Sequence, residues 1–375
     1  MKILYTASVL SHICQFHLAV MALLQKEGHE VHVAARDNLA EKNGLQLKNT
    51  DKYFNIPFQR SPKDKRNLEA MKQLKQLLQN EHYDIIICNT PVCGVLTRLA
   101  AKEARKQGTK VIYIAHGFHF YNGAPKKYWA IYPIEKYMAE HFTDLLITIN
   151  KEDYERATRK FKCKTAHICG IGVSSVRYKP ATPEQQYEMR TREGLTDDDF
   201  VITCCKELMY DNNQKTLLKA VAKIREQIPN VRVLIAGNGP DEQMLKDLTE
   251  ELKLTDVVRF LGYRIDLEQV VPAANLVVSC SYREGMPFNI MEAMLSARPI
   301  AASHNRGHDE LIDDGETGYL FSMLDDDALA DAILKIYNNP EQAAAFGQCA
   351  YKKVQDYTAD AVAAQMDTII KSLGE

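Results

Sequence analysis

The sequence predicts an α/β protein made of two domains, each built around a doubly wound parallel sheet. Short runs rich in Val, Ile and Leu alternate with longer runs of helical periodicity, which is typical of parallel strands joined by helices. The length of 375 residues is more than one ordinary core accommodates. Residues 1–180 hold 28 Lys and Arg against 16 Asp and Glu, and residues 181–375 hold 19 against 33. One basic half and one acidic half indicate two units with different partners.

Strands and helices alternate regularly in the first half of the chain. Strands are expected at 2–9, 30–35, 53–56, 84–88, 110–115, 145–150 and 165–168, and helices at 11–26, 64–79, 92–106, 126–141 and 151–161. The first strand-to-helix turn lacks G-x-G-x-x-G, which disfavours a nicotinamide-dependent dehydrogenase. Ser11 and His12 follow this strand, at the edge where doubly wound sheets bind ligands. We therefore predict ligand contact there, and the alternative for His12 is an ordinary surface residue at a helix start.

A loop rich in rings follows the strand at 110–115. It reads Ala-His-Gly-Phe-His-Phe-Tyr-Asn-Gly over 115–123, with His116 directly at the strand end. This position favours contact with a bound substrate. A metal site is a weaker interpretation, because His116 and His119 lie three residues apart in a loop without a nearby acidic ligand.

The predicted helix at 126–141 combines aromatic and basic side chains. Rings beside lysines are typical of a membrane interface, and the basic first half favours an anionic membrane surface as its partner. The alternatives are core packing of the rings and solvated helix faces. Nucleic acid is disfavoured, because no nucleic-acid motif accompanies the charge. The side chains concerned are Lys126, Lys127, Tyr128, Trp129, Tyr132, Lys136 and Tyr137.

A polar stretch with Pro180 and Pro183 separates the two halves and predicts a linker. We expect a first domain over 1–172, a linker over 173–190, a second domain over 191–356 and a separate C-terminal helix over 357–375. The second half repeats the alternation, with strands at 200–203, 232–236, 257–261, 276–279 and 298–302 and helices at 214–227, 241–252, 325–337, 340–356 and 359–373.

Residues 283–294 carry the most specific signal of the chain and read Arg-Glu-Gly-Met-Pro-Phe-Asn-Ile-Met-Glu-Ala-Met after a strand. Pro287 suits a first helical position, and a helix N-terminus offers amides and a positive dipole end to phosphate. Glu284 and Glu292 are expected to reach one opening, because helical side chains lean toward the N-terminus. Ionised carboxylates accept hydrogen bonds from sugar hydroxyls, so the stretch predicts a nucleotide-sugar site. The alternative is a pair of solvated or dipole-compensating carboxylates.

With seven residues between its glutamates, this stretch resembles the E-x7-E signature of the retaining glycosyltransferases of family 4. Their GT-B architecture has two Rossmann-like doubly wound domains that face an interdomain cleft. His-Gly-Phe-His-Phe at 116–120 and Tyr-Pro-Ile-Glu-Lys at 132–136 are similar to the branch that builds polysaccharides and capsules. The resemblance implies that Glu284 binds hydroxyls of the donor sugar, that Glu292 binds the nucleotide ribose, and that His116 contacts the donor sugar.

The same resemblance implies the remaining parts of the site. The acceptor is expected on the first domain, where Ser11 and His12 lie, and the helix over 357–375 crosses back to that domain. The donor diphosphate is expected at the backbone of Gly285, Met286, Phe288 and Asn289, the base at Tyr263 and Arg264, and a close ligand approach at the turn of Gly237 and Gly239.

The chain departs from the family where cations normally neutralise the leaving diphosphate. Many members place Arg near the position of Glu207 and Lys near that of Asn212. Loss of such a cation is costly, because electrostatic stabilisation of a developing charge is worth several kcal/mol. Lys206 and Lys215 lie close enough in sequence to replace it. The alternative is a slow or inactive protein.

We therefore expect a retaining glycosyltransferase that moves a hexose or N-acetylhexosamine from a UDP-sugar to a lipid-linked or growing saccharide in exopolysaccharide or capsule biosynthesis. No metal or other cofactor is expected, because amides, helix dipole and lysines suffice for the diphosphate. A UDP-sugar epimerase and an inactive UDP-binding scaffold are the alternatives. We expect no secretory signal, because the first residues lead directly into a short predicted strand. The nine cysteines show no metal spacing. The expected place is the cytoplasm, peripheral to the inner face of the plasma membrane.

Overall fold

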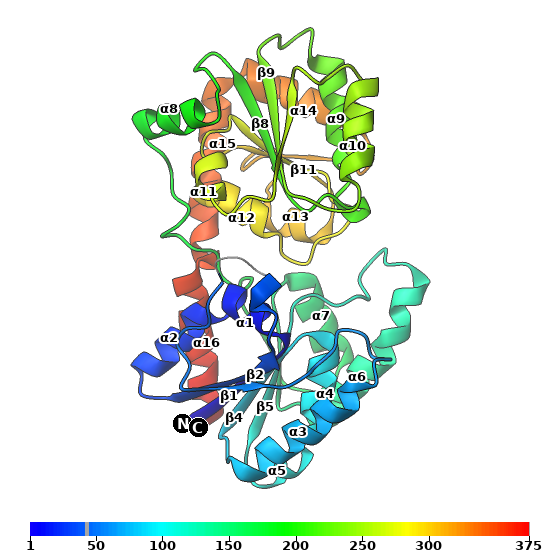
Figure 1. Cartoon of the computed structure of the whole chain (residues 1–375), viewed down its shortest axis with the longest axis vertical. Helices are drawn as coiled ribbons and strands as arrows, with labels where there is room; N and C mark the ends of the chain where they lie inside the picture. The colour runs from blue at the N-terminus through cyan, green and yellow to red at the C-terminus, as the bar shows by residue number, and fades with distance from the viewer. Residues whose placement is uncertain (42–44, 375) are drawn as a thin grey trace. The chain divides into compact units, whose positions relative to one another are not determined.

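The computed structural model describes residues 1–41 and 45–374. Contacts divide the chain into two compact units. Unit 1 comprises Met1–Gly172 together with the C-terminal segment that begins at Ala359, and unit 2 comprises Val173–Thr358. Each unit contains one parallel sheet with helices on both faces, so the predicted fold class of two doubly wound α/β domains is confirmed (Figure 1).

The sheet of unit 1 has the order β3-β2-β1-β4-β5-β6-β7, and all its pairings are parallel. Its strands are β1 Lys2–Val9, β2 Glu30–Arg36, β3 Lys52–Asn55, β4 Ile85–Asn89, β5 Lys110–Ala115, β6 Leu145–Thr148 and β7 Thr165–His167. Its helices are α1 Leu10–Phe16, α2 Leu18–Lys26, α3 Arg66–Asn80, α4 Pro91–Ala100, α5 Lys102–Lys106, α6 Tyr132–Phe142, α7 Lys151–Lys160 and α16 Ala359–Gly374, with 3-10 turns η1 Leu39–Glu41 and η2 Lys126–Ile131.

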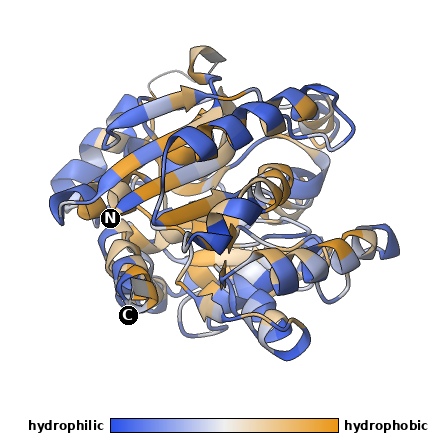
Figure 2. Ribbon diagram, turned by 90° about the horizontal axis from the view of Figure 1, so that it is seen from below, coloured by the Kyte–Doolittle hydropathy of each residue, from blue (hydrophilic) through white to orange (hydrophobic). Residues whose placement is uncertain are grey.

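Burial explains why the strands of unit 1 are apolar throughout rather than alternating. Every residue of β4 and β6 is buried, as expected for a parallel sheet covered on both faces. Side chains of α3, α4, α6 and α7 share one core with the sheet, and α16 packs against α2. In Figure 2 the strands are mainly hydrophobic, and the surrounding helices turn hydrophilic faces outward.

Unit 2 repeats this plan with the order β10-β9-β8-β11-β12-β13, again with parallel pairings throughout. Its strands are β8 Phe200–Cys205, β9 Val231–Ala236, β10 Val258–Gly262, β11 Leu276–Ser279, β12 Ile300–Ser303 and β13 Tyr319–Phe321. Its helices are α8 Pro183–Arg192, α9 Gln214–Ile224, α10 Glu242–Glu251, α11 Leu267–Val270, α12 Phe288–Leu295, α13 Arg306–Leu311, α14 Asp326–Asn338 and α15 Pro340–Lys353, with 3-10 turns η3 Tyr210–Asn212 and η4 Val354–Tyr357.

Several local predictions are wrong in their detail. The helix expected at 92–106 is interrupted at Ala101, and the one expected at 126–141 begins as a 3-10 helix. The single helix expected at 11–26 is broken at His17, whose backbone (φ −124°, ψ −4°) ends α1 and precedes α2. Pro287 is the residue before α12 and not its first helical residue, because its ψ of 116° is extended.

Part of the stretch 173–190, which we expected as a linker, is helical. Thr182 and Gln185 form a reciprocal capping box at the start of α8, and Pro183 occupies the first helical turn. These two devices satisfy orphan amides and fix a helical φ, so a polar sequence begins a helix here. Among the described residues, no helix is both long and apolar enough to cross a bilayer.

The largest fully buried side chain of the described chain is that of Arg98 on α4. Its guanidinium forms two hydrogen bonds to the Glu135 carboxylate, at 2.6 and 3.1 Å, and lies 4.0 Å from the centre of the Tyr113 ring. Gly94 carries no side chain where a Cβ would come within 2.6 Å of that ring. This pair joins α4 and α6 inside the core of unit 1.

We predict that Glu135→Ala destabilises unit 1 by about 3–5 kcal/mol, because it leaves a buried guanidinium without its counter-charge. Urea unfolding followed by far-UV circular dichroism measures the loss. Glu103→Ala is the matched control, since Glu103 pairs with Lys106 on the surface and such pairs contribute about 0–1 kcal/mol. Equal losses in the two variants would contradict the importance of the buried pair.

Candidate functional site

Unit 2 gathers polar side chains where three neighbouring strands end. β8, β11 and β12 lie side by side and run parallel, so their carboxyl ends share one edge of the sheet. The strand order reverses between β8 and β11. Open α/β sheets bind ligands outside the carboxyl ends of the strands at such a switch point.

The pair formed by Lys206 and Glu284 lies at this switch point. Lys206 directly follows β8, and its Nζ forms an ion pair with Glu284 Oε1 and donates a hydrogen bond to Ser281 Oγ at 3.0 Å. The two charged side chains are only 17% and 16% exposed. Burial lowers the pKa of Lys206 to about 8, so the ammonium still carries its charge at neutral pH. The site therefore holds a partly buried cation beside a carboxylate.

Backbone contacts fix the loop that carries Glu284. Asn305 Nδ2 donates to the Ser281 carbonyl at 2.9 Å, and Arg306 Nε donates to the Glu284 carbonyl at 3.1 Å. A Cβ at Gly307 would come within 2.7 Å of the Glu284 Cβ, closer than real contacts allow. The start of α13 therefore packs directly against the Glu284 loop and holds its carboxylate near Lys206.

The glycine turn after β9 fixes the loop that carries Lys206. A Cβ at Gly237 (φ +144°) would lie 2.0 Å from the Lys206 carbonyl oxygen, and one at Gly239 would lie 2.2 Å from the Leu208 carbonyl oxygen. The Leu208 amide also donates to the Asn238 carbonyl at 2.9 Å. The two glycines thus permit a close approach of backbone to backbone, a reason that the sequence does not reveal. Their contact with a ligand stays a prediction.

Asn212, the residue that departs from the family, supports the same loop. Its Nδ2 donates to the Glu207 carbonyl at 2.7 Å, and its Oδ1 accepts from Ser281 Oγ at 3.3 Å. The Glu207 side chain is exposed. Of the two lysines expected to replace the missing cation, Lys206 meets Glu284, whereas Lys215 lies over the Tyr210 ring at 5.6 Å.

Glu292, in the second turn of α12, has a separate set of partners. Tyr178 and Arg177 lie close enough to its carboxyl group to influence its ionisation. Burial raises the pKa of Glu292 to about 7, against the effects of Tyr178 and Arg177. Arg177 Nε also donates to Glu268 at 2.7 Å. Sequence reasoning missed Arg177 and Tyr178 because both lie in the expected linker, where a charged and an aromatic residue side by side were the available signal.

The N-terminus of α12 has no side-chain cap. Met286 and Asn289 are buried at this end, and Asn289 Nδ2 has no hydrogen-bond partner among the described residues. An uncapped helix start with a positive dipole end is a suitable place for an anion. Gly285 lies between Glu284 and this end, and its contact with a diphosphate stays a prediction.

Arg264 and Tyr263, which we predicted near a nucleotide base, differ in their availability. Arg264 donates to both carboxylate oxygens of Asp266, at 2.6 and 2.8 Å, and to Glu193 at 2.9 Å. These two carboxylates raise the pKa of Arg264 further above its ordinary value. Its guanidinium is therefore engaged within unit 2, whereas the Tyr263 side chain is exposed.

In unit 1, Ser11 and His12 have different environments although they are neighbours. Ser11 is buried, its amide donates to Asn38 Oδ1 at 3.0 Å, and its Oγ accepts from Asn38 Nδ2 at 2.9 Å. Both polar groups of Ser11 are thus paired with one side chain. This pairing gives Ser11 a structural role in holding the start of α1.

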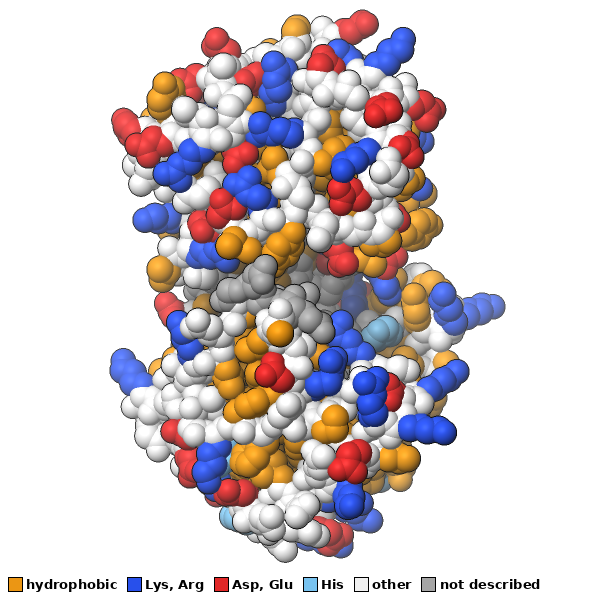
Figure 3. All heavy atoms as spheres, in the orientation of Figure 1, with side chains coloured by type: hydrophobic (Ala, Val, Ile, Leu, Met, Phe, Trp, Pro, Cys, Tyr) orange, Lys and Arg blue, Asp and Glu red, His pale blue; other side chains and the backbone are white. Residues whose placement is uncertain are grey.

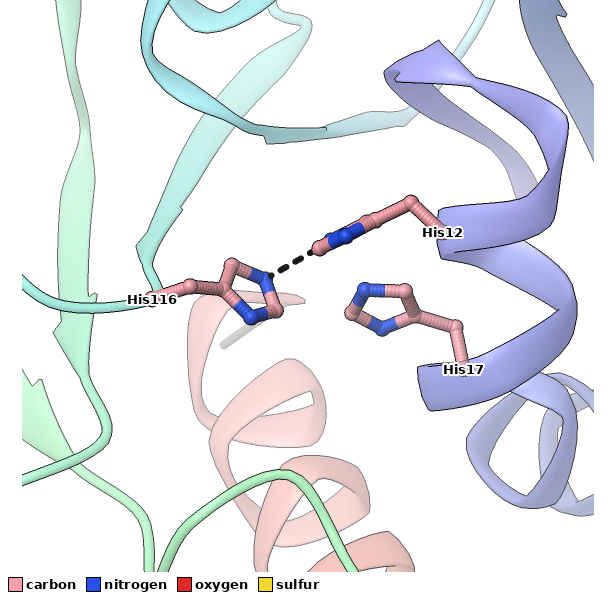
Figure 4. A group of neighbouring side chains, drawn as sticks. All are labelled: His12, His17 and His116. Atoms are coloured by element: carbon pink, nitrogen blue, oxygen red, sulfur yellow. Dashed lines mark hydrogen bonds between the residues drawn. The ribbon is translucent and has the colours of Figure 1, made fainter. Parts of the chain in front are cut away.

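His12 meets His116 and His17 in a cluster of three imidazoles (Figure 4). His12 Nε2 lies 3.3 Å from His116 Nε2, and His116 Nε2 lies 3.0 Å from Asn89 Oδ1. Burial lowers the pKa of His116 to about 4 and holds the pKa values of His12 and His17 well below their ordinary range. For His12 the neighbouring histidines and Arg60 add to this lowering. All three rings are neutral at neutral pH.

The cluster differs from the histidine pair considered in the sequence. His119 is not one of the three, and its ring lies 6.2 Å from that of Tyr128. His17 was missed, because a continuous helix over 11–26 would point it away from His12.

Known proteins resemble this chain along nearly its full length. A family model described as Glycosyl transferase 4-like matches residues 2–150, and one described as Glycosyl transferases group 1 matches residues 185–353. EpsD of Bacillus subtilis strain 168, named provisionally as a glycosyltransferase, is 42% identical over 350 residues, which cover 92% of this chain and 90% of EpsD.

Two further proteins are more distant. The UDP-Gal:alpha-D-GlcNAc-diphosphoundecaprenol alpha-1,3-galactosyltransferase of Escherichia coli is 27% identical over 285 residues, 72% of each chain. The crystal structure of HepE from Anabaena in complex with UDP and glucose matches with a TM-score of 0.79 at 21% identity, covering 99% of this chain and 100% of HepE. HepE therefore shares the fold of this chain.

Proposed function

The chain belongs to the family 4 type of glycosyltransferases with the two-domain GT-B fold, and from this premise we propose that it transfers a hexose or N-acetylhexosamine from a UDP-sugar to a lipid-linked or growing saccharide with retention of the anomeric configuration. The observation that carries the proposal is the pair of Lys206 and Glu284 at the switch point of unit 2. The UDP complex of HepE and the diphosphoundecaprenol substrate named for the Escherichia coli relative support the choice of donor and acceptor.

In this proposal Lys206 supplies the cation that the family usually places elsewhere. Its ammonium neutralises the diphosphate, while Glu284 accepts hydrogen bonds from hydroxyls of the donor sugar. A partly buried charge acts on a leaving group more strongly than a solvated one, because less water screens it. Asn212 then needs no charge, since its amide holds the loop from which Lys206 extends.

The nucleotide is assigned to the other end of the same motif. Glu292 accepts from the ribose hydroxyls, and the uncapped start of α12 receives the diphosphate at the backbone around Gly285 and Asn289. The base lies beside Tyr263, which it meets through backbone groups. No metal takes part at the diphosphate. In unit 1, His116 keeps the contact with the donor sugar that the resemblance implies, and His12 keeps the contact with the acceptor.

Transfer proceeds on one face of the sugar. The bond between the anomeric carbon and the diphosphate oxygen breaks, and the acceptor oxygen bonds to that carbon from the same side. The acceptor proton passes to the leaving diphosphate, so atoms and charges balance without a nucleophile from the protein. A covalent sugar adduct on any side chain would exclude this route.

We predict that Lys206→Met lowers kcat for the cognate donor by about 10²–10³, the usual cost of removing one electrostatic stabiliser. Lys215→Met, the matched control, is expected to leave kcat within about a factor of two, because Lys215 lies over the Tyr210 ring, whereas Glu284 pairs with Lys206. A panel of UDP-sugars is first screened by calorimetry, and UDP release is then followed with and without polyprenyl-diphosphate saccharides.

The same experiment separates the alternative functions. Interconversion of UDP-sugars without an acceptor would establish an epimerase, and UDP binding without turnover in any assay would establish an inactive scaffold. A larger loss in Lys215→Met than in Lys206→Met would contradict the assignment of the cation.

We predict that UDP binds most tightly between about pH 7 and pH 8. Below about pH 7 the Glu292 carboxyl group is protonated and accepts fewer hydrogen bonds from ribose. Above about pH 8 Lys206 loses its proton and no longer neutralises the diphosphate. The dissociation constant, measured by calorimetry from pH 5.5 to 9, is expected to rise by up to about tenfold per pH unit on each side, the limit for one proton.

Two variants test which residue causes the acidic side and which the basic side of the pH dependence of UDP binding. Glu292→Gln cannot ionise, so it is expected to flatten the acidic side beyond the titration of UDP itself. Lys206→Met is expected to flatten the basic side alone. An unchanged acidic side in Glu292→Gln would show that Glu292 does not contact the nucleotide.

We further propose that unit 1 docks on an anionic membrane through an aromatic–lysine surface formed by Lys126, Lys127, Trp129, Ile131, Ile134 and Tyr137. These residues lie on η2 and α6, and their four apolar side chains are between 36% and 55% exposed. Along this edge of unit 1, Figure 3 shows basic and hydrophobic side chains together at the surface. Exposed large apolar groups beside lysines suit the headgroup region of a bilayer, where a lipid-linked acceptor is found.

Ile134→Asp with Tyr137→Asp is expected to reduce cosedimentation with vesicles of phosphatidylglycerol by at least about tenfold, because two charges must enter the interface. The control Leu68→Asp with Met244→Asp removes two exposed apolar residues elsewhere and is expected to leave vesicle binding unchanged. Equal binding by both double variants would exclude this surface.

A further inference from the structure

Three imidazoles converge at the carboxyl edge of the sheet in unit 1. His12 lies on α1 after β1, His116 follows β5, and β4 between those strands ends in Asn89. One ring nitrogen from each of His12, His17 and His116 lies within 4.8 Å of the other two. Figure 4 shows the three rings turned toward one common point.

The break between α1 and α2 is what brings His17 into the group. On a continuous helix, residues five apart point about 140° away from each other, so His12 and His17 would not face one ligand. The break occurs in Phe16-His17-Leu18, without the Pro or Gly that usually causes one. The break between the two helices turns His12 and His17 toward each other. No residue type that usually breaks a helix accounts for it.

His17 also carries an unsatisfied polar atom. Its side chain is buried, and its Nε2 has no hydrogen-bond partner among the described residues. Figure 4 shows this edge of the ring directed toward His12 and His116. A buried polar nitrogen without a partner is unfavourable, so a ligand at the common point would remove a cost that the protein otherwise bears.

We propose that His12, His17 and His116 bind one divalent transition-metal ion, with Zn²⁺ as the best match, through their Nε2 atoms. Imidazole nitrogens are suitable ligands for zinc, and three histidines are a known ligand set for a zinc ion that keeps an open fourth position. With Zn–N bonds of about 2.0–2.1 Å, two ligands of a tetrahedral ion lie about 3.3–3.4 Å apart. The Nε2 atoms of His12 and His116 are already 3.3 Å apart.

The hydrogen bonds of Asn89 show which ring nitrogen of His116 carries the proton. Asn89 Nδ2 donates to the Thr6 carbonyl at 3.2 Å, which turns Asn89 Oδ1 toward His116. An amide oxygen only accepts, so His116 Nε2 carries the proton in this contact. Metal binding requires that proton to move to Nδ1 of the same ring, which leaves the charge of the imidazole unchanged.

The surroundings keep the ligands ready for an ion. Metals bind imidazole through a ring nitrogen, and one such nitrogen from each ring already lies within 4.8 Å of the other two. The positive charge of Arg60 acts on His12 and disfavours a cation at the cluster. The Arg60 side chain is exposed, however, so solvent screens its charge. All three ligands lie in unit 1. Two of them, His12 and His116, also carry the contacts with acceptor and donor sugar proposed above, so the inference deepens the proposed function, but Zn²⁺ binding can be measured without either substrate.

Metal binding by the full chain tests the proposal directly. Protein without a histidine tag is stripped with a chelator and titrated with Zn²⁺ by calorimetry, and with Co²⁺ by visible absorption. One ion per chain and the intense bands of tetrahedral cobalt are expected. His17→Ala and His12→Ala are each expected to weaken Zn²⁺ binding by more than the roughly 10–100-fold that loss of a supporting partner costs.

His119→Ala is the matched control, because His119 lies in the same loop as His116 but outside the cluster. It is expected to retain full Zn²⁺ affinity. Thermal unfolding adds a second measurement, since Zn²⁺ is expected to raise the Tm of the wild type and of His119→Ala but not of the cluster variants.

Two results would overturn the proposal. One is a wild type that binds no Zn²⁺, and the other is equal loss of binding in His119→Ala and His17→Ala. If His17→Ala and His12→Ala fail to fold, the cobalt spectrum and stoichiometry of the wild type still decide the question. A protein that transfers sugar without binding Zn²⁺ would refute this inference alone, whereas Zn²⁺ binding without UDP-sugar turnover would refute the proposed function alone.

Discussion

The burial of a parallel sheet on both faces is the constraint on which the rest of the structure depends. Every residue of β4, β8 and β11 is buried and most are apolar, because helices cover both faces of each sheet. Chemistry is therefore confined to the strand ends. In unit 2 this edge carries Lys206 and Glu284, and in unit 1 it carries the histidine cluster. The two units use the same plan to present different chemical groups.

Close backbone packing fixes the position of the charged pair of unit 2. Lys206 and Glu284 come from separate loops, and each loop is held by glycines that allow a neighbouring segment to approach within contact distance, Gly237 in one case and Gly307 in the other. A glycine in a predicted ligand-binding turn can thus act indirectly, by fixing the backbone of the residue that contacts the ligand. The buried amide of Asn212 acts in the same way on the Lys206 loop.

Burial acts differently on the titratable groups of the two units. Burial brings the pKa of Lys206 down and that of Glu292 up, to about 8 and about 7, so both groups change charge near neutral pH. The histidines of unit 1 respond differently, since burial leaves them neutral. Neutral nitrogen ligands and an ionised lysine suit opposite partners, a metal cation in one unit and a diphosphate in the other.

The sequence by itself determined the fold class, the alternation of strands and helices, and the Glu284-to-Glu292 motif, because apolar periodicity and turn residues act over a few neighbouring positions. It also placed His116 directly after a strand. Only the tertiary structure decided that Lys206 rather than Lys215 meets Glu284, that Arg264 is engaged by carboxylates, that Tyr178 lies near Glu292, and that His17 joins His12. Each of these depends on loops far apart in the chain that meet at a sheet edge, where a few degrees of backbone rotation select one partner over another, and no local pattern encodes that choice.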